Sequence, residues 1–130
     1  MRTQFSIRSF FVAASMCIAS LPALAGEVPY DKAELNAALA QGKPVIVDFA
    51  ADWCPTCKAQ QPIVQSLLGD AKRQSLTLFK ANYDTEVALK KRLGVTQQST
   101  FVVFKGGNEV GRSTGQTQKS ALAELFDKAL

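Results

Sequence analysis

Residues 45–58, which read VIVDFAADWCPTCK, decide the fold. They open with an apolar run over residues 45–49 that a single acid, Asp48, interrupts. Such a run is typical of a strand that lies in the centre of a sheet and is buried on both faces. A turn over residues 50–56 follows the strand, and a helix is then predicted through Leu68.

Helices and strands alternate on both sides of this stretch. Before it, Asp31 and Glu34 have the spacing of a helix-capping pair, and Leu35 and Leu39 share one helix face, which predicts a helix over residues 31–41. After it, the pattern predicts these elements in order: a strand over residues 76–79, a helix that Asp84 or Thr85 caps and Gly94 ends, a strand over residues 101–104, a turn over residues 106–108, a returning strand over residues 109–112 and a helix over residues 117–130.

The first 25 residues have the pattern of a cleavable secretory signal. Two arginines give a positive start, residues 10–21 form a 12-residue apolar run, and residues 22–25 (PALA) end in the small-residue pattern that signal peptidase cleaves. A membrane anchor is the alternative, but a spanning helix needs about 20 apolar residues. We therefore expect cleavage after Ala25, a periplasmic location, and one domain over residues 26–130 without a membrane span.

The composition excludes several mechanisms. The 130-residue chain has no histidine, so it has no Ser-His-Asp or Cys-His relay and no imidazole metal ligand. Of its three cysteines, Cys17 lies in the signal, which leaves Cys54 and Cys57. The 15 basic side chains fall to 13 when the two signal arginines leave, against 11 acidic ones. Because the basic residues form no stripe, a nucleic-acid partner is disfavoured.

The spacing of Cys54 and Cys57 points to redox chemistry. Two cysteines three residues apart at the start of a helix lie close enough to form a disulfide. The unpaired N–H groups and the positive end of the helix dipole favour a thiolate on Cys54. Pro55 suits the first helical position. Cys57 lies one turn into the helix and is expected to be the less exposed of the two. Cys54 would then attack a disulfide, and Cys57 would resolve the mixed disulfide.

Three other interpretations of the cysteine pair stay open. The pair could form a structural disulfide, although a loop this short contributes little to stability. It could hold a metal, although two cysteines supply only half of the ligands that zinc requires. It could also be a relic in a domain that only binds proteins. We favour redox chemistry, with no metal.

Residues 47–58 resemble the active-site segment of thioredoxins, and the order of elements over residues 27–130 resembles the thioredoxin fold. The resemblance implies an α/β domain in which helices flank a central mixed β-sheet. Thioredoxins usually have Gly-Pro between the cysteines, where this chain has Pro-Thr. The Ala-Asp-Trp-Cys context is most similar to periplasmic thioredoxin-like reductases, including the C-terminal domain of the membrane reductase DsbD.

The resemblance also implies roles for individual residues. Asp48 matches the buried aspartate that accepts a proton from the resolving cysteine, and burial in an apolar strand independently raises the pKa of a carboxyl group. Lys80 matches a lysine that approaches this aspartate from the neighbouring strand. Trp53 matches a tryptophan that shapes the docking surface, and Pro62 matches a proline inside the active-site helix. Asp48 facing solvent and Lys80 as an ordinary surface lysine are the alternatives.

Ser99 departs from the family pattern, because thioredoxins have a cis-proline at this position. A cis bond before a residue other than proline costs about 3 to 4 kcal/mol. We therefore predict a trans Gln98–Ser99 peptide and a remodelled loop that removes a steric block beside Cys54 and adds a hydroxyl. An open loop of this kind would also allow two molecules to share a metal or cluster. The residues expected to contact substrate are Trp53, Pro55, Thr56, Gln98, Ser99 and Thr100.

These features predict a monomeric thiol-disulfide oxidoreductase that reduces disulfides of exported proteins, with Cys54, Cys57, Asp48 and Lys80 as its catalytic residues. No G-x-G-x-x-G motif follows a strand, so no nicotinamide or flavin cofactor is expected. Electrons would come by thiol exchange from a membrane transporter of the DsbD or CcdA type. A dithiol oxidase and a non-enzymatic module that binds proteins, a metal or a cluster are the alternatives.

Overall fold

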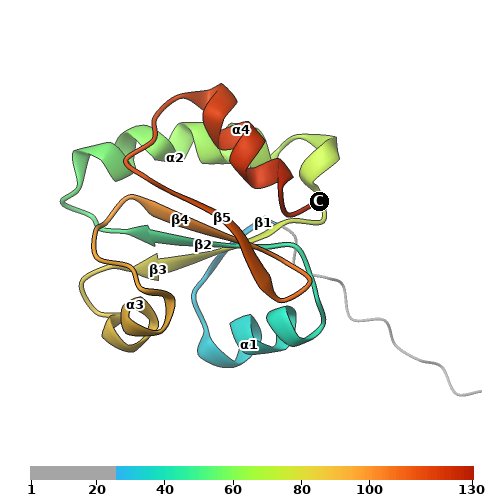
Figure 1. Ribbon diagram of the computed structural model, residues 1–130. Coiled ribbons are helices and arrows are strands. Elements are labelled where there is room, and N and C mark those ends of the chain that lie inside the picture. The colour runs from blue at the N-terminus through green and yellow to red at the C-terminus, as the bar shows by residue number, and fades with distance from the viewer. Residues whose placement is uncertain (1–25) are drawn as a thin grey trace, which may run out of the picture.

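The computed structural model describes residues 26–130. The predicted signal, its cleavage after Ala25 and the loss of Cys17 lie outside the described residues. Figure 1 shows the elements, which are, in chain order, β1 (Gly26–Pro29), α1 (Lys32–Ala40), β2 (Val45–Ala50), α2 (Pro55–Leu68), the 3-10 turn η1 (Ala71–Arg73), β3 (Thr77–Asn82), α3 (Val87–Leu93), β4 (Thr100–Lys105), β5 (Asn108–Thr114) and α4 (Lys119–Asp127).

The strands form one mixed sheet in the order β1-β3-β2-β4-β5. Strands β1, β3 and β2 are parallel, β4 runs antiparallel to β2, and β5 runs antiparallel to β4. The middle position of β2 explains its apolar sequence, because both of its faces are covered and residues 45–49 are all buried. The predicted central strand and the predicted α/β fold with a mixed sheet flanked by helices are both confirmed.

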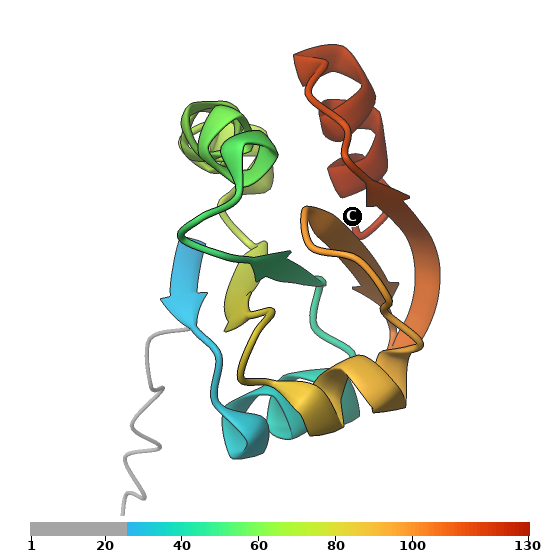
Figure 2. The same ribbon diagram turned by 90° about the vertical axis from the view of Figure 1, so that its left-hand side faces the viewer.

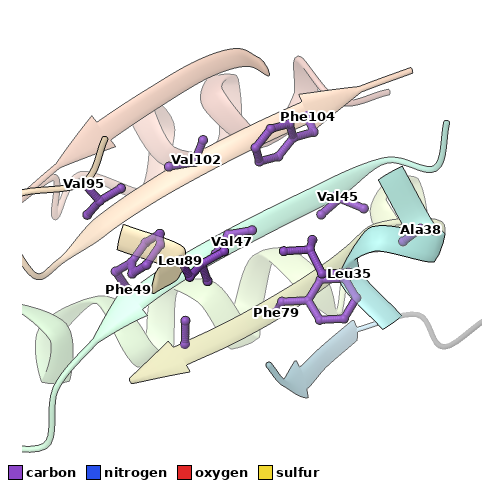
Figure 3. Packing of buried hydrophobic residues seen from close by; sticks show 11 residues of the cluster. Leu35, Ala38, Val45, Val47, Phe49, Phe79, Leu89, Val95, Val102 and Phe104 are labelled. Carbon is purple, nitrogen blue, oxygen red and sulfur yellow. The ribbon is translucent and has the colours of Figure 1, made fainter. Parts of the chain in front are cut away.

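Helices cover both faces of the sheet, with α1 and α3 on one face and α2 and α4 on the other (Figures 1 and 2). Alternate residues of β2 point to opposite faces. Val45, Val47 and Phe49 join the apolar cluster under α1 and α3, which Figure 3 shows. Ile46 joins the cluster under α2 and α4, so Asp48 points to this second face as well.

The helix ends agree with the sequence at α1 and differ at α3. At α1, Asp31 Oδ1 accepts a hydrogen bond of 2.9 Å from the Glu34 N–H, as the capping pattern predicts. The prediction that Asp84 or Thr85 caps α3 is wrong, because this helix starts only at Val87. The Asn82 side chain accepts hydrogen bonds from the N–H groups of both residues and holds them in a turn before the helix.

Strand β1 was not predicted from the sequence. It has four residues and lies at the edge of the sheet, where β3 is its strand partner among residues 26–130. The Gly26 N–H donates to the Leu76 carbonyl at 2.9 Å, and the Tyr30 N–H donates to the Lys80 carbonyl at 2.9 Å. Pairing with β3 therefore stabilises a segment that has no strand pattern of its own. Within residues 26–130, no helix has the length and apolar character that crossing a membrane requires.

Candidate active site

The two cysteines lie between the carboxyl end of β2 and the first turn of α2, where they form a disulfide with a Cα–Cα distance of 5.3 Å. Cys54 caps the helix, since its Sγ accepts a hydrogen bond of 3.1 Å from the Cys57 N–H. Pro55 takes the first helical position, where no N–H is needed. These local features confirm the predicted placement of the dithiol at a helix start.

The exposure of the two cysteines is the reverse of the prediction. Cys54 is 1% exposed and Cys57 is 8% exposed, so Cys57 is not the more deeply buried one. The helix position of a cysteine does not determine its exposure here, because Ser99 lies against both sulfurs and Cys57 alone of the two also lines a pocket. Cys57 lines a pocket of about 350 Å³, together with Ala50, Ala51, Asp52, Lys58, Gln61, Lys80, Ala81 and Asn82. This pocket gives water a route to the Cys57 side of the dithiol.

Asp48 is buried on the face of the sheet that α2 covers, with 4% of its surface exposed. Its Oδ1 atom has no hydrogen-bond partner among the described residues. The pKa of Asp48 is raised to about 7, chiefly by burial; the positive charge of Lys80 opposes this rise, and the negative charge of Glu27 adds to it. The predicted rise is therefore confirmed, and the alternative of a solvent-facing Asp48 is wrong. A carboxyl group that titrates near neutrality can both accept and return a proton.

Lys80 lies beside Asp48 in the register of β3 with β2, but its ammonium group is held by other partners. Its Nζ donates to Gln61 Oε1 at 2.9 Å and lies 3.5 Å from Glu27 Oε1. Glu27 Oε2 in turn accepts hydrogen bonds from the side-chain amides of Gln61 and Gln65. Lys80 thus acts on Asp48 through its charge while Glu27 and Gln61 fix its position.

Sequence reasoning missed both Glu27 and Gln61. Glu27 lies on β1, the strand that was not predicted, so no signal marked it. Gln61 lies four residues after Cys57 in the same helix, and this spacing places both on one face. The spacing was therefore the available signal for Gln61.

Ser99 lies against both sulfur atoms. Its Oγ is 3.0 Å from Cys54 Sγ and 3.1 Å from Cys57 Sγ, and its side chain is buried. The described residues contain no cis peptide bond, so the predicted trans Gln98–Ser99 peptide is confirmed. The expected opening beside Cys54 is wrong, because the Ser99 hydroxyl fills the space next to the sulfurs.

The other residues expected to contact substrate differ in exposure. Trp53 is 57% exposed, and its Nε1 donates to Asp84 Oδ2 at 2.8 Å. Pro55 is exposed, and Thr56 and Gln98 are half-buried. These four side chains are therefore accessible at least in part. Trp53, Pro55 and Thr56 adjoin the cysteines in the chain, and Gln98 adjoins Ser99, which contacts both sulfurs.

The environments of Thr100 and Pro62 indicate that these two residues support the fold. Thr100 is buried, and its Oγ1 bonds to the Gln97 carbonyl and to Thr114 Oγ1, both at 2.8 Å. Pro62 lies inside α2, as the resemblance implies. Over residues 26–130, no three His, Cys, Asp or Glu side chains gather in a way that could hold a metal ion.

Comparisons with known proteins agree with this geometry. The thioredoxin family profile matches residues 27–128. A thioredoxin from Chlamydia caviae is 36% identical over 84 residues, which cover 65% of this chain and 80% of the relative. Among solved structures, Trxlp from Edwardsiella tarda has a TM-score of 0.74 and 42% identity, covering 77% of this chain and 96% of that one. A thioredoxin mutant from Halobacterium salinarum has a TM-score of 0.72 and 25% identity, covering 85% and 96%. The chain belongs to the thioredoxin family and is a thioredoxin-like thiol-disulfide oxidoreductase.

Proposed function

We propose that this protein reduces disulfides of exported proteins. The observation that carries the proposal is the combination of a dithiol at a helix start with a buried carboxyl group, Asp48, whose pKa is raised to about 7. The first step needs a thiolate on Cys54. The Cys57 N–H and the start of α2 stabilise this negative charge. The thiolate attacks one sulfur of the client disulfide, forms a mixed disulfide and expels the other client sulfur as a thiolate.

The second step releases the client. Cys57 loses its proton to Asp48, and its thiolate attacks Cys54 Sγ. The Cys54–Cys57 disulfide forms, the bond between Cys54 and the client breaks, and the second client sulfur leaves. The client gains the two electrons that the dithiol loses, and two protons complete the client thiols. The pocket that Cys57 and Lys80 line lies on the Cys57 side of the dithiol and supports an exchange of protons with water there.

Export and re-reduction are further parts of the proposal. The secretory pattern of residues 1–25 supports export to the periplasm and cleavage after Ala25. An oxidising compartment does not return reduced thiols by itself. A membrane electron donor of the DsbD or CcdA type, which exchanges thiols with the Cys54–Cys57 disulfide, therefore fits the proposed location. We propose that the exported domain acts as a monomer.

An insulin-reduction assay on the purified domain tests the activity. The wild type is expected to speed the precipitation of reduced insulin, and Cys54→Ser is expected to abolish this effect because no attacking thiolate remains. Cys57→Ser is expected to trap the client as a stable adduct, visible on a non-reducing gel. Ser66→Ala removes an exposed hydroxyl elsewhere on α2 and is the control. Full activity of Cys54→Ser would contradict the mechanism.

Two further measurements test direction and location. A reduction potential measured against glutathione is expected to lie nearer to the roughly −270 mV of thioredoxin than to the roughly −120 mV of the oxidase DsbA. A value at the oxidising end would assign an oxidase instead. Fractionation of cells that express the full chain is expected to find a shortened protein, which begins at Gly26, in the periplasm. An unprocessed protein in the cytoplasm would overturn the export part alone.

A further inference from the structure

Ser99 holds one hydroxyl group between two sulfur atoms. The distances from its Oγ are 3.0 Å to Cys54 Sγ and 3.1 Å to Cys57 Sγ, within the range for a hydrogen bond to sulfur. The side chain is 3% exposed, so water does not compete freely for these contacts. A hydroxyl has a single proton to donate, and it can rotate to suit its partner. Ser99 can therefore donate to only one of the two sulfurs at a time.

The backbone around Ser99 fixes this position. Its φ of 58° lies in the left-handed region, which a residue other than glycine adopts only with strain. The Ser99 carbonyl accepts a hydrogen bond of 2.9 Å from the Gly115 N–H and a longer one of 3.5 Å from Gln60 Nε2. Two other segments of the chain thus hold the loop in an uncommon conformation that points the hydroxyl at the dithiol.

Each half of the disulfide exchange leaves a negative charge on a different sulfur. The attack on the client requires a thiolate on Cys54, and the release requires a thiolate on Cys57. A thiolate in a buried site needs donors, because its charge is poorly solvated there. Cys54 already has the Cys57 N–H as one donor. For Cys57, the Ser99 hydroxyl is the donor that the described residues show.

We propose that Ser99 is a catalytic residue whose hydroxyl donates a hydrogen bond to the Cys54 thiolate in the attack and turns to the Cys57 thiolate in the release. The O–H bond stays intact, so no proton, electron or covalent bond passes to the serine. This inference rests on the dithiol chemistry of the proposed function and adds a shared donor to both of its steps. It also implies that the hydroxyl stabilises the reduced dithiol relative to the disulfide.

Single-cysteine proteins test the two contacts separately. In a Cys57→Ala background only Cys54 titrates as a thiol in the pair, and in a Cys54→Ala background only Cys57 does. Ser99→Ala is added to each, and the ultraviolet absorbance of the thiolate is followed against pH. A hydrogen bond to a charged group is worth about 1.5 to 3 kcal/mol, so the thiolate fraction at a pH below the thiol pKa is expected to fall about ten-fold or more in both backgrounds.

Ser99→Gly separates the hydroxyl from the backbone conformation. Glycine adopts a positive φ without strain, so this variant removes the hydroxyl and relieves the loop at once. The proposal predicts the same fall in thiolate for Ala and Gly, while Ser66→Ala in each background changes nothing. An unchanged titration of either cysteine in the Ala and Gly variants overturns the shared donor, and a fall with Ala but not with Gly assigns the effect to the backbone and also overturns it.

The titration needs no client and no electron donor. A protein that failed to reduce insulin would contradict the proposed function and would leave the Ser99 result readable. In the two-cysteine protein, Ser99→Ala is expected to shift the equilibrium with glutathione toward the disulfide by about ten-fold, for the same reason. A shift in the opposite direction would contradict the role of Ser99 in stabilising the reduced form.

Discussion

The two faces of the sheet are built from the same strands but differ in the side chains that they bury and in their roles. Along β2, the face toward α1 and α3 carries only apolar side chains, Val45, Val47 and Phe49, which join the cluster that Figure 3 shows. The cluster under α2 and α4 is apolar at Ile46 and is interrupted at Asp48, where Lys80 and Glu27 approach from neighbouring strands. The first face of β2 therefore only stabilises the fold. The second face is less stabilising at one end, because it buries a carboxyl group that can exchange protons.

The largest expected effect comes from the apolar face. Phe104 is buried in the cluster under α1 and α3 and lies opposite Val45 in the sheet, away from the dithiol. Phe104→Ala is expected to lower the free energy of unfolding by about 3 to 5 kcal/mol, because it leaves a cavity in the cluster. Urea denaturation measures this loss, and Val110→Ala, on the exposed part of β5, is the control. A loss below 1 kcal/mol would show that this face is not the main source of stability.

Asp48→Asn is expected to raise the free energy of unfolding at alkaline pH, where Phe104→Ala lowers it. A raised pKa in the folded state means that the neutral carboxyl stabilises the fold below the unfolded pKa of 3.8, and that this stability is lost as the pH rises toward about 7. At pH values above 7 the buried charge is present in the wild type and absent in the variant. We expect a stabilisation of about 2 to 3 kcal/mol there, since the amide must itself be buried, and little or none near pH 4.

The measurement for Asp48→Asn is urea denaturation at an acidic and an alkaline pH. Glu124→Gln, on the exposed side of α4, is the control and should show no such pH dependence. The same substitution is expected to slow insulin reduction, because Cys57 loses its proton acceptor. A variant that is destabilised equally at both pH values would show that the ionised carboxylate of Asp48 does not destabilise the fold.

Glu27→Gln is expected to have a smaller effect on the same face. The negative charge of Glu27 raises the pKa of Asp48, so its removal lowers this pKa, but only slightly, because burial, the larger cause, remains. The carboxyl resonance of Asp48, followed by NMR against pH, measures the change. The pH at which insulin reduction is half maximal should move in the same direction. Glu34→Gln, on α1 at the opposite face, is the control, and an Asp48 titration that moves upward would contradict the role of Glu27.

Trp53→Phe is expected to have the smallest effect on stability. The hydrogen bond from Trp53 Nε1 to Asp84 is exposed, and such a bond contributes about 0.5 to 1.5 kcal/mol. Thermal unfolding of Trp53→Phe, Asp84→Ala and the double variant forms a cycle that isolates this contact. Strictly additive effects would show that the contact contributes nothing, and that other residues hold Trp53 in place.

Sequence reasoning succeeded where a signal was local. The apolar run of β2 with its single acid predicted a buried strand and, through that burial, a raised pKa for Asp48. The helix start at Cys54 and Pro55 was equally local. These features were sufficient to identify the fold and the dithiol.

It failed where distant segments decide the outcome. Strand β1 exists through its pairing with β3, so Glu27 could not be placed beside Lys80 from sequence. The cover over the two cysteines comes from Ser99, which lies against both sulfurs and is 45 positions from Cys54 in the chain. The α3 cap was misplaced because the Asn82 side chain accepts hydrogen bonds from the N–H groups of Asp84 and Thr85 and holds both residues in a turn before the helix. In each case the missing information was a contact, and no local pattern encodes it.

The buried amide of Gln60 joins three segments that are far apart in the chain. From α2 it donates to the Gln116 carbonyl at 2.9 Å and to the Ser99 carbonyl at 3.5 Å, and the Gly115 N–H donates to the same Ser99 carbonyl. Breaking one of these bonds leaves buried polar groups without partners, so we expect the loop before β4 and the segment that leads to α4 to open together. Hydrogen exchange at the Gly115 amide, whose acceptor is the Ser99 carbonyl, is then expected to report how often this loop opens over the dithiol.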